Sequence, residues 1–143
     1  MPDLHHLVRI AAPVTRVNPL VCTGKGFRKW WAEDVESAPD GVVTLGFFDR
    51  STVYVLRPIG QATVSRAEWR CESGDEWSGT RLLFELERQA NETVVRFTHA
   101  DWKAATDYFV SCNTTWGRLM FLLKAAAEEQ SSDPLFRRNG MGY

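Results

Sequence analysis

The sequence lacks an excess of charge of either sign and any long apolar run. Its 17 lysines and arginines nearly balance its 18 aspartates and glutamates, which gives a formal net charge of −1. Nucleic-acid-binding domains normally carry a basic excess, and binding to an anionic membrane surface normally needs a basic cluster. No apolar run approaches the roughly 20 residues of a membrane-spanning helix. We therefore expect no nucleic-acid partner and no membrane insertion.

Cysteine is scarce, and its spacing fits neither a disulfide framework nor a metal site. Cys22, Cys71 and Cys112 are an odd number, lie far apart and form no C-x-x-C pair. Such cysteines are typical of free thiols in a reducing compartment. The N-terminus also lacks the basic start and apolar stretch of a signal peptide. The sequence therefore predicts a cytoplasmic protein with no metal site and no cofactor.

Motifs of nucleophilic, metal-dependent and phosphate-binding catalysis are missing as well. There is no Gly-x-Ser-x-Gly, no His-Glu-x-x-His and no glycine-rich phosphate loop. His5 and His6 have no third metal ligand in view. The acidic residues Glu33, Asp34 and Glu36 are most simply interpreted as a solvated loop. The sequence thus indicates no identifiable enzyme class.

Aromatic residues, by contrast, are plentiful. The 143 residues include six tryptophans and eight phenylalanines, which provide large, rigid apolar surfaces suited to a core or to a cavity wall. A chain of this length is typical of one domain and can bury about two-thirds of its unfolded surface. We expect a single domain over residues 1–143, with a loose C-terminal tail from about 131 to 143.

Alternating apolar and polar residues predict a sheet with one covered and one wet face. This alternation is typical of antiparallel strands. The expected strands are 4–10, 42–48, 52–57, 63–71, 80–88 and 93–99. Charged residues on the wet face are expected to pair across strands. These are Arg66, Glu68 and Arg70 on one strand, and Arg81, Glu85 and Glu87 on the next.

A long C-terminal helix is expected to cover the apolar face. Between about residues 106 and 130 there is no proline, and apolar residues recur at three- and four-residue steps. They are Phe109, Cys112, Trp116, Leu119, Met120, Leu123 and Ala127. Two short helical segments are expected earlier, at 14–22 and 27–31, and Pro19 should shorten or kink the first. The expected class is therefore α+β.

Four stretches in this order carry a resemblance to a known family. They are Ala12-Pro13-Val14-x-x-Val17; Thr23 leading to Phe27-x-x-Trp30-Trp31; Trp69-x-Cys71 followed by Trp77-x-Gly79-Thr80; and Thr93-x-Val95-x-Phe97-x-His99-x-x-Trp102 before a helix with Cys112-x-x-x-Trp116 and Leu122-Leu123-Lys124. Together they resemble the START-like (SRPBCC, birch-pollen-allergen-type) helix-grip superfamily. Within it, the chain is similar to the branch named after the activator of the heat-shock-protein ATPase, which overlaps the polyketide-cyclase and lipid-transport group.

The resemblance implies a curved six-stranded antiparallel sheet around the long C-terminal helix, with two short helices after strand one and a cavity between sheet and helix. Proteins of this group typically hold apolar or aromatic molecules there. The ligand-binding residues expected from the inward pattern and the resemblance are Trp30, Tyr54, Trp69, Phe84, Phe97, His99, Tyr108, Cys112, Trp116 and Met120. The same side chains could instead interlock as a solid core. Adjacent helical residues point about 100° apart, so one of Trp30 and Trp31 should face the cavity, and which one stays open.

Three hypotheses about function remain at this stage. The first is a non-catalytic domain that binds a lipid- or polyketide-like apolar or aromatic small molecule. The second is a cyclase- or aromatase-like enzyme in which His99 moves a proton. His99 can equally be a structural residue bonded to backbone or paired with Asp101. The third is a domain that contacts a chaperone or client protein. Either a monomer or a homodimer is compatible with the sequence.

Overall fold

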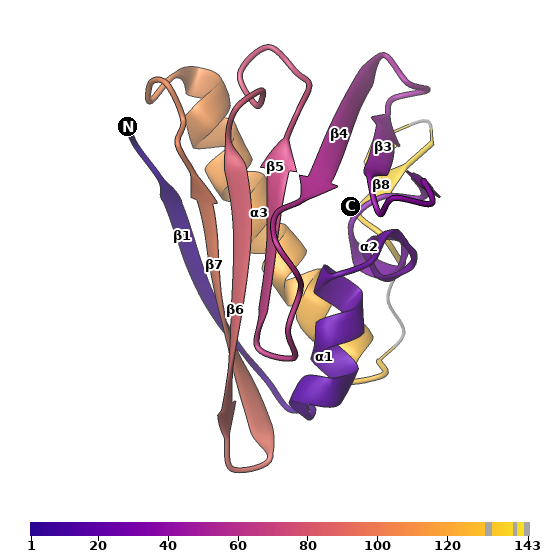
Figure 1. Cartoon of the computed structure of the whole chain (residues 1–143), viewed down its shortest axis with the longest axis vertical. Coiled ribbons are helices and arrows are strands. Elements are labelled where there is room, and N and C mark those ends of the chain that lie inside the picture. Colours follow the sequence, from indigo (N-terminus) through magenta and orange to yellow (C-terminus); the bar gives the residue numbers. More distant parts are fainter. Residues whose placement is uncertain (131–132, 139, 142–143) are drawn as a thin grey trace.

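Seven antiparallel strands form one curved sheet in this computed structural model, which describes residues 1–130, 133–138 and 140–141 (Figure 1). The strands are β1 (Leu4–Ile10), β2 (Asp34–Ser37), β3 (Val43–Phe47), β4 (Thr52–Pro58), β5 (Arg66–Cys71), β6 (Arg81–Gln89) and β7 (Glu92–Ala100). Their order across the sheet is β1-β7-β6-β5-β4-β3-β2. The prediction of an antiparallel sheet is confirmed, but the predicted count of six strands is wrong by one.

The additional strand is β2, which the sequence analysis interpreted as a solvated acidic loop. It pairs antiparallel with β3, and Asp34 lies opposite Gly46. Acidic residues are depleted in strands, which is why the pattern pointed to a loop. Here the Asp34 side chain is buried because Arg50 donates two hydrogen bonds to its carboxylate, at 2.9 and 2.8 Å. The ion pair makes an acidic edge strand possible.

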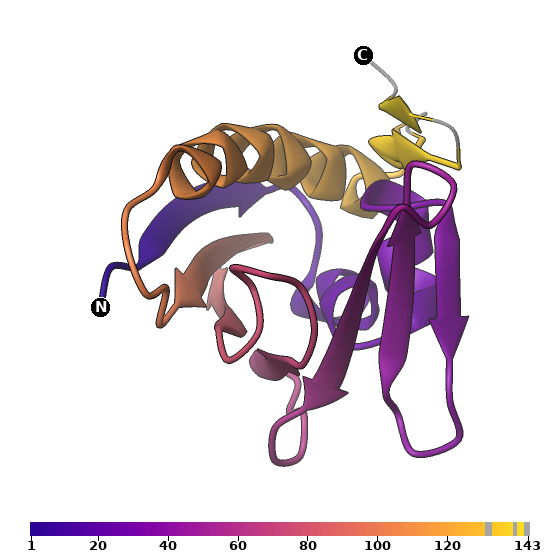
Figure 2. The ribbon, with the colours of Figure 1, turned by 90° about the horizontal axis from the view of Figure 1, so that it is seen from above.

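Within the part of the chain that the structure describes, three helices lie on the concave side of the sheet. They are α1 (Val14–Val21), α2 (Gly24–Trp30) and α3 (Asp107–Ala127). The hydroxyl groups of Thr23 and Thr106 cap α2 and α3, since each accepts a hydrogen bond from a first-turn backbone N–H. α1 is short, as Pro19 predicted, with only two residues following the proline. Figure 2 shows α3 lying across the hollow of the curved sheet.

The apolar faces of the sheet and of α3 look toward each other, as the two periodicities predicted. The ring of Trp116 on α3 lies 4.2 Å from the ring of Phe97 on β7, centroid to centroid. Phe84 on β6 lies 4.9 Å from Phe97 on the same face. All three side chains are fully buried. The helix therefore grips the sheet through aromatic contacts.

The wet face carries the expected cross-strand charge pairs. Arg66 on β5 lies opposite Glu85 on β6, and their charged groups are 3.7 Å apart. Arg81 on β6 contacts Glu68 on β5 at 2.5 Å, whereas Arg70 lies opposite Arg81 and not opposite an acidic residue. Glu87 pairs instead with Arg96 on β7, at 3.1 Å. Such exposed pairs contribute little to stability but keep this face polar. Within the described residues, no helix is both long enough and apolar enough to cross a membrane.

The described part of the C-terminal segment is more ordered than the predicted loose tail. Leu135 has no exposed surface, and its backbone N–H bonds to the carbonyl of Trp30 at 3.2 Å. A short hairpin follows, formed by β8 (Phe136–Arg137) and β9 (Gly140–Met141), which lies close to the β3–β4 turn (Figure 2). The tail prediction was wrong here because one buried leucine anchors the segment. Residues 131–132, 139 and 142–143 lie outside the described residues.

A close helix approach generates the first testable prediction. A Cβ on Gly26 would lie 2.1 Å from the carbonyl oxygen of Pro19 and 2.6 Å from the Cα of Leu20, both backbone atoms of α1. Gly26→Ala should therefore destabilise the fold by about 1–3 kcal/mol in a denaturant titration, despite the higher helix propensity of alanine. Gly117→Ala in α3 is the matched control, because its nearest neighbour is His6 at 3.6 Å. It should be neutral or stabilising, and equal losses in both variants would contradict the packing argument.

Candidate functional site

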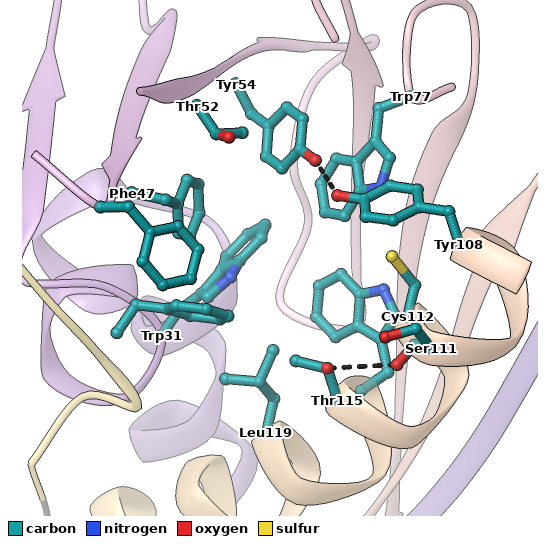
Figure 3. Close-up of a pocket in the computed structure, with 13 residues that line it drawn as sticks. Trp31, Phe47, Thr52, Tyr54, Trp77, Tyr108, Ser111, Cys112, Thr115 and Leu119 are labelled. Atoms are coloured by element: carbon teal, nitrogen blue, oxygen red, sulfur yellow. Dashed lines mark hydrogen bonds between the residues drawn. The ribbon is translucent and has the colours of Figure 1, made fainter. Parts of the chain in front are cut away.

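A cavity of about 230 Å³ opens between α3, the β3–β4 hairpin and the C-terminal segment (Figure 3). Its walls are mainly aromatic. It is lined by Trp31, Phe47, Phe48, Thr52, Tyr54, Trp77, Tyr108, Ser111, Cys112, Thr115, Trp116, Leu119 and Phe136. Among the residues that the structure describes, no lining side chain carries a charge at neutral pH. The site therefore offers stacking surface and a few neutral polar groups.

Two tyrosines from different elements supply the most prominent polar contact. Tyr54 on β4 and Tyr108 at the start of α3 point toward each other, and their hydroxyl groups form a hydrogen bond (Figure 3). The ring of Tyr54 also stacks on Trp77, with centroids 3.9 Å apart and planes 3° from parallel. Burial raises the pKa of Tyr108 to about 12, and burial also raises the pKa of Tyr54. Both groups are therefore neutral phenols at physiological pH.

Trp77 and Cys112 add a donor and a thiol to the same wall. The indole Nε1 of Trp77 is buried and makes no hydrogen bond of normal geometry with any described residue. The Cys112 thiol lies beside it. Burial raises the pKa of Cys112, although the neighbouring Trp77 and Tyr108 side chains lower it in part. A raised pKa keeps the thiol protonated, which makes Cys112 a poor nucleophile.

His99 lies outside the cavity lining and is buried in the core. Its Nδ1 accepts a hydrogen bond from the indole N–H of Trp116 at 3.1 Å. The other ring nitrogen, Nε2, lies 2.8 Å from the hydroxyl of Thr80. Because an indole N–H can only donate, a neutral His99 carries its proton on Nε2 and donates it to Thr80. The Thr80 hydroxyl in turn donates to the carbonyl of Trp77 at 2.6 Å. His99 thus fixes Trp116 and the segment around Trp77.

The structure divides the ten predicted site residues into two groups. Tyr54, Tyr108, Cys112 and Trp116 line the cavity. Six others are packed in the core away from the lining: Trp30, Trp69, Phe84, Phe97, His99 and Met120. Of the two adjacent tryptophans, Trp31 faces the cavity, whereas Trp30 turns away and donates its indole N–H to the carbonyl of Leu20 at 2.8 Å.

The two short helices explain this division. Phe27 of α2 inserts against the ring of Trp69 on β5, with centroids 5.2 Å apart, and it also approaches Phe84 on β6 at 6.4 Å. The indole of Trp69 donates to the backbone carbonyl of Val21 at the end of α1. α1 and α2 therefore fill the space below the centre of the sheet. The opening remains at the β3–β4 end.

Several cavity residues were missed by sequence reasoning. Phe47 belongs to a predicted strand, and Trp77 belongs to a motif used for the resemblance, so both gave a usable signal. Phe136 gave none, because it lies in the segment interpreted as a tail. The structure brings its ring to 4.8 Å from that of Phe47, edge to face. Its backbone N–H also bonds to the carbonyl of Trp31 at 3.0 Å.

The β3–β4 turn that borders the cavity has an unusual backbone. Phe48, Asp49 and Arg50 have consecutive φ values of 51°, 55° and 64°. This left-handed conformation costs roughly 1–2 kcal/mol for each residue other than glycine. Arg50 is held by the buried Asp34 carboxylate, and the hydrogen bond and charge of Arg50 lower the pKa of Asp34. The turn is therefore strained but anchored.

Comparisons with known proteins agree with this architecture. The sequence matches no family model, and no curated protein is significantly similar to it. Among solved structures, the Aha1 dimer from Colwellia psychrerythraea has a TM-score of 0.79 and 28% identity, over 90% of this chain and 97% of that chain. A START superfamily protein from Mycobacterium smegmatis has a TM-score of 0.66 and 14% identity, over 89% and 97%. CalU16 from Micromonospora echinospora has a TM-score of 0.72 and 13% identity, over 93% and 70%.

The curved antiparallel sheet, the long C-terminal helix across it and the two short helices after β1 define a helix-grip (START-like) fold. With the Colwellia Aha1 protein the likeness extends to sequence, at 28% identity over nine-tenths of the chain.

The environment of His99 generates a prediction about stability. Burial lowers the pKa of His99 to about 3, whereas an unfolded histidine titrates near 6.5. The unfolded state therefore binds an additional proton between these values. Stability from neutral His99 is fully present above about pH 6.5 and is lost as the pH falls below it, by up to about 1.4 kcal/mol per pH unit. Urea unfolding at pH 7, 6 and 5 measures this slope.

His99→Gln should flatten that pH dependence, whatever its effect on absolute stability. His5→Gln, which alters an exposed histidine, should leave the slope unchanged. The interpretation is wrong if both variants retain the wild-type slope.

Proposed function

We propose that this chain binds an uncharged aromatic small molecule of one or two rings in the cavity beside α3. The single observation that carries this proposal is the aromatic wall around an uncharged space of about 230 Å³. Binding sites for small molecules are typically apolar clefts with a few placed polar groups. Trp31, Trp77 and Trp116 lie in the wall with nearly all of their surface buried, and the Tyr54–Tyr108 pair offers hydroxyl groups.

The volume limits the size of the ligand. An apolar cavity of about 150 Å³ is enough for benzene, whereas drug-sized ligands usually occupy roughly 300–1,000 Å³. A volume of about 230 Å³ lies between the two. It suits one or two fused rings better than the long lipid or polyketide chain expected from the resemblance. A larger ligand would require the cavity to widen.

The absence of charge limits the chemistry of the ligand. A carboxylate or ammonium group transferred into this site would lose its hydration without meeting an opposite charge on any described lining residue. A hydroxyl or carbonyl group, by contrast, can exchange hydrogen bonds with Tyr54 or Tyr108. If the wall adjusts, an acceptor on the ligand can also meet the indole N–H of Trp77, which has no hydrogen-bond partner among the described residues. A neutral ligand with one polar group fits these side chains.

The two other hypotheses have less support. The cyclase-like hypothesis needs His99 to exchange protons with a substrate, yet both ring nitrogens are occupied in the core and its low pKa keeps it neutral. The hypothesis of a chaperone or client partner rests on the likeness to the Colwellia Aha1 protein alone, and fold is weak evidence for function. That protein is a dimer, and whether this chain is a monomer or a homodimer remains a prediction.

The six tryptophans provide an internal test of binding. In a ¹H–¹⁵N NMR spectrum each indole N–H gives its own signal. On addition of 2-naphthol, a neutral two-ring phenol, the signals of Trp31, Trp77 and Trp116 should shift because these residues line the cavity. The signals of Trp30, Trp69 and Trp102, which lie in the core, should move least. 2-Naphthoate, which adds a carboxylate, should bind at least tenfold more weakly, since burying its charge costs more than about 1.4 kcal/mol.

A pair of variants on α3 locates the site. Ser111→Phe places a ring at the cavity lining and should abolish the naphthol shifts. Asn113→Phe adds the same ring at an exposed position outside the lining and should leave them unchanged. The proposal loses its basis if 2-naphthol shifts none of the six signals, or shifts them equally in both variants.

A further inference from the structure

We infer that the turn formed by Phe48, Asp49 and Arg50 is a movable lip of the cavity, held closed against its own backbone strain by the Asp34 carboxylate. Opening of this lip would set the rate at which a ligand enters and leaves. The inference rests on the proposed function for the ligand. The motion itself can be measured without one.

The position of the lip links it to the cavity. Phe48 lines the cavity and is 46% exposed, so it lies where the interior meets solvent. Its ring lies 6.0 Å from that of Phe136, edge to face. Thr52, four residues after Phe48, begins β4 and also lines the cavity. A change in the backbone at Phe48 would therefore move part of the cavity wall.

The strain favours opening. Three consecutive residues other than glycine hold positive φ values, and only glycine adopts this region without a steric penalty. Such conformations persist where the surrounding structure over-determines them, and they gather at binding and switching segments. One hydrogen bond, from the N–H of Ser51 to the carbonyl of Phe48 at 3.1 Å, closes the turn. It spans only the turn and does not tie it to the rest of the fold.

The Asp34 carboxylate opposes the strain. Arg50 donates to both oxygens of Asp34, and this planar two-bond geometry is the strongest type of ion pair available to a carboxylate. The fold reserves room for it, because a Cβ on Gly46 would lie 2.3 Å from Oδ2 of Asp34. A second tie joins the N–H of Asp49 to the carbonyl of Arg138 at 2.6 Å. The bonds from Arg50 to Asp34 on β2 thus hold the turn in a strained backbone conformation that it would otherwise leave.

Two variants should move this balance in opposite directions. Asp49→Gly removes one left-handed penalty, and the Asp49 side chain is exposed, so the closed lip should become more stable. Asp34→Asn removes the buried one of the two carboxylate charges that hold Arg50, since Glu36 is the other at 3.2 Å, and it preserves the size of the side chain, so the lip should open more often. Ala90→Gly is the matched control, because Ala90 also has a positive φ, 53°, but lies in the exposed β6–β7 turn away from the cavity.

The measurement combines amide hydrogen exchange with ligand exchange. Exchange of the Ser51 amide, which the Phe48 carbonyl protects, reports opening in the free protein. Release of 2-naphthol, followed by NMR exchange spectroscopy, reports passage through the mouth. Both rates should fall about fivefold in Asp49→Gly. Both should rise roughly tenfold in Asp34→Asn. Both should stay at the wild-type values in Ala90→Gly.

The outcomes separate the lip from the ligand. Opposite shifts of Ser51 exchange in the two variants support the moving lip, and parallel shifts of naphthol release support its control of access. Unchanged Ser51 exchange, or a change in the same direction in both variants, overturns the inference even when naphthol binds. If naphthol binds to no variant, the proposed function fails, and Ser51 exchange alone then decides whether the lip moves.

Discussion

The interior depends on the way one side chain, Trp116, is fixed. One side of its indole meets Phe97 on β7, with ring centroids 4.2 Å apart, and its N–H is bonded to His99. The other side borders the cavity and lies 5.0 Å from the ring of Trp31. A tryptophan left free to rotate would fill the open space or lose its partner. The indole N–H is the only hydrogen-bond donor of the Trp116 side chain, and His99 accepts it. Trp116 is therefore held in place, between a packed region of the interior and the open cavity.

On the packed side, side chains of α1 and α2 fill the interior. Phe27 enters between the tryptophans and Phe84, at distances typical of aromatic contacts. On the open side, α3 presents smaller groups, including Ser111, Cys112 and Thr115. The helix is continuous across both regions, so residue size along α3 and the reach of α2 together decide where space remains. The fold alone does not determine the position of the cavity.

This difference between filled and open space also shows how much of the structure could be predicted from the sequence. The alternation in β5 to β7 and the three- and four-residue steps of α3 correctly predicted which faces meet, because burial of one face imposes those periods directly. The same patterns could not separate filled from open space. Trp69 and Trp116 both point inward, yet only Trp116 borders the cavity, since contact with Phe27 depends on how α2 is oriented.

Two further failures have the same origin in long-range contacts. The sequence pattern did not predict β2, because Asp34 is a poor strand residue unless Arg50, sixteen positions away in the chain, neutralises its charge. The place of Phe136 in the cavity wall was not predicted, because its partners Trp31 and Phe47 are about a hundred residues distant in the chain. Neither short-range periodicity nor composition reports such a partner. Local sequence patterns therefore predicted the layers of the fold, whereas the cavity depends on contacts between distant segments that these patterns do not report.

Burial also determines what kind of selection the site can exercise. It raises the pKa values of Tyr54, Tyr108 and Cys112 and lowers that of His99, so all four groups are uncharged near neutral pH. The direction differs between the acids and the base, but the cause is the same loss of hydration for the charged form. With no ionised group at its walls among the described residues, the cavity can distinguish ligands by shape, by ring stacking and by neutral hydrogen bonds. Attraction between opposite charges acts at the border of the cavity, where the Asp34–Arg50 pair holds the wall and not the ligand.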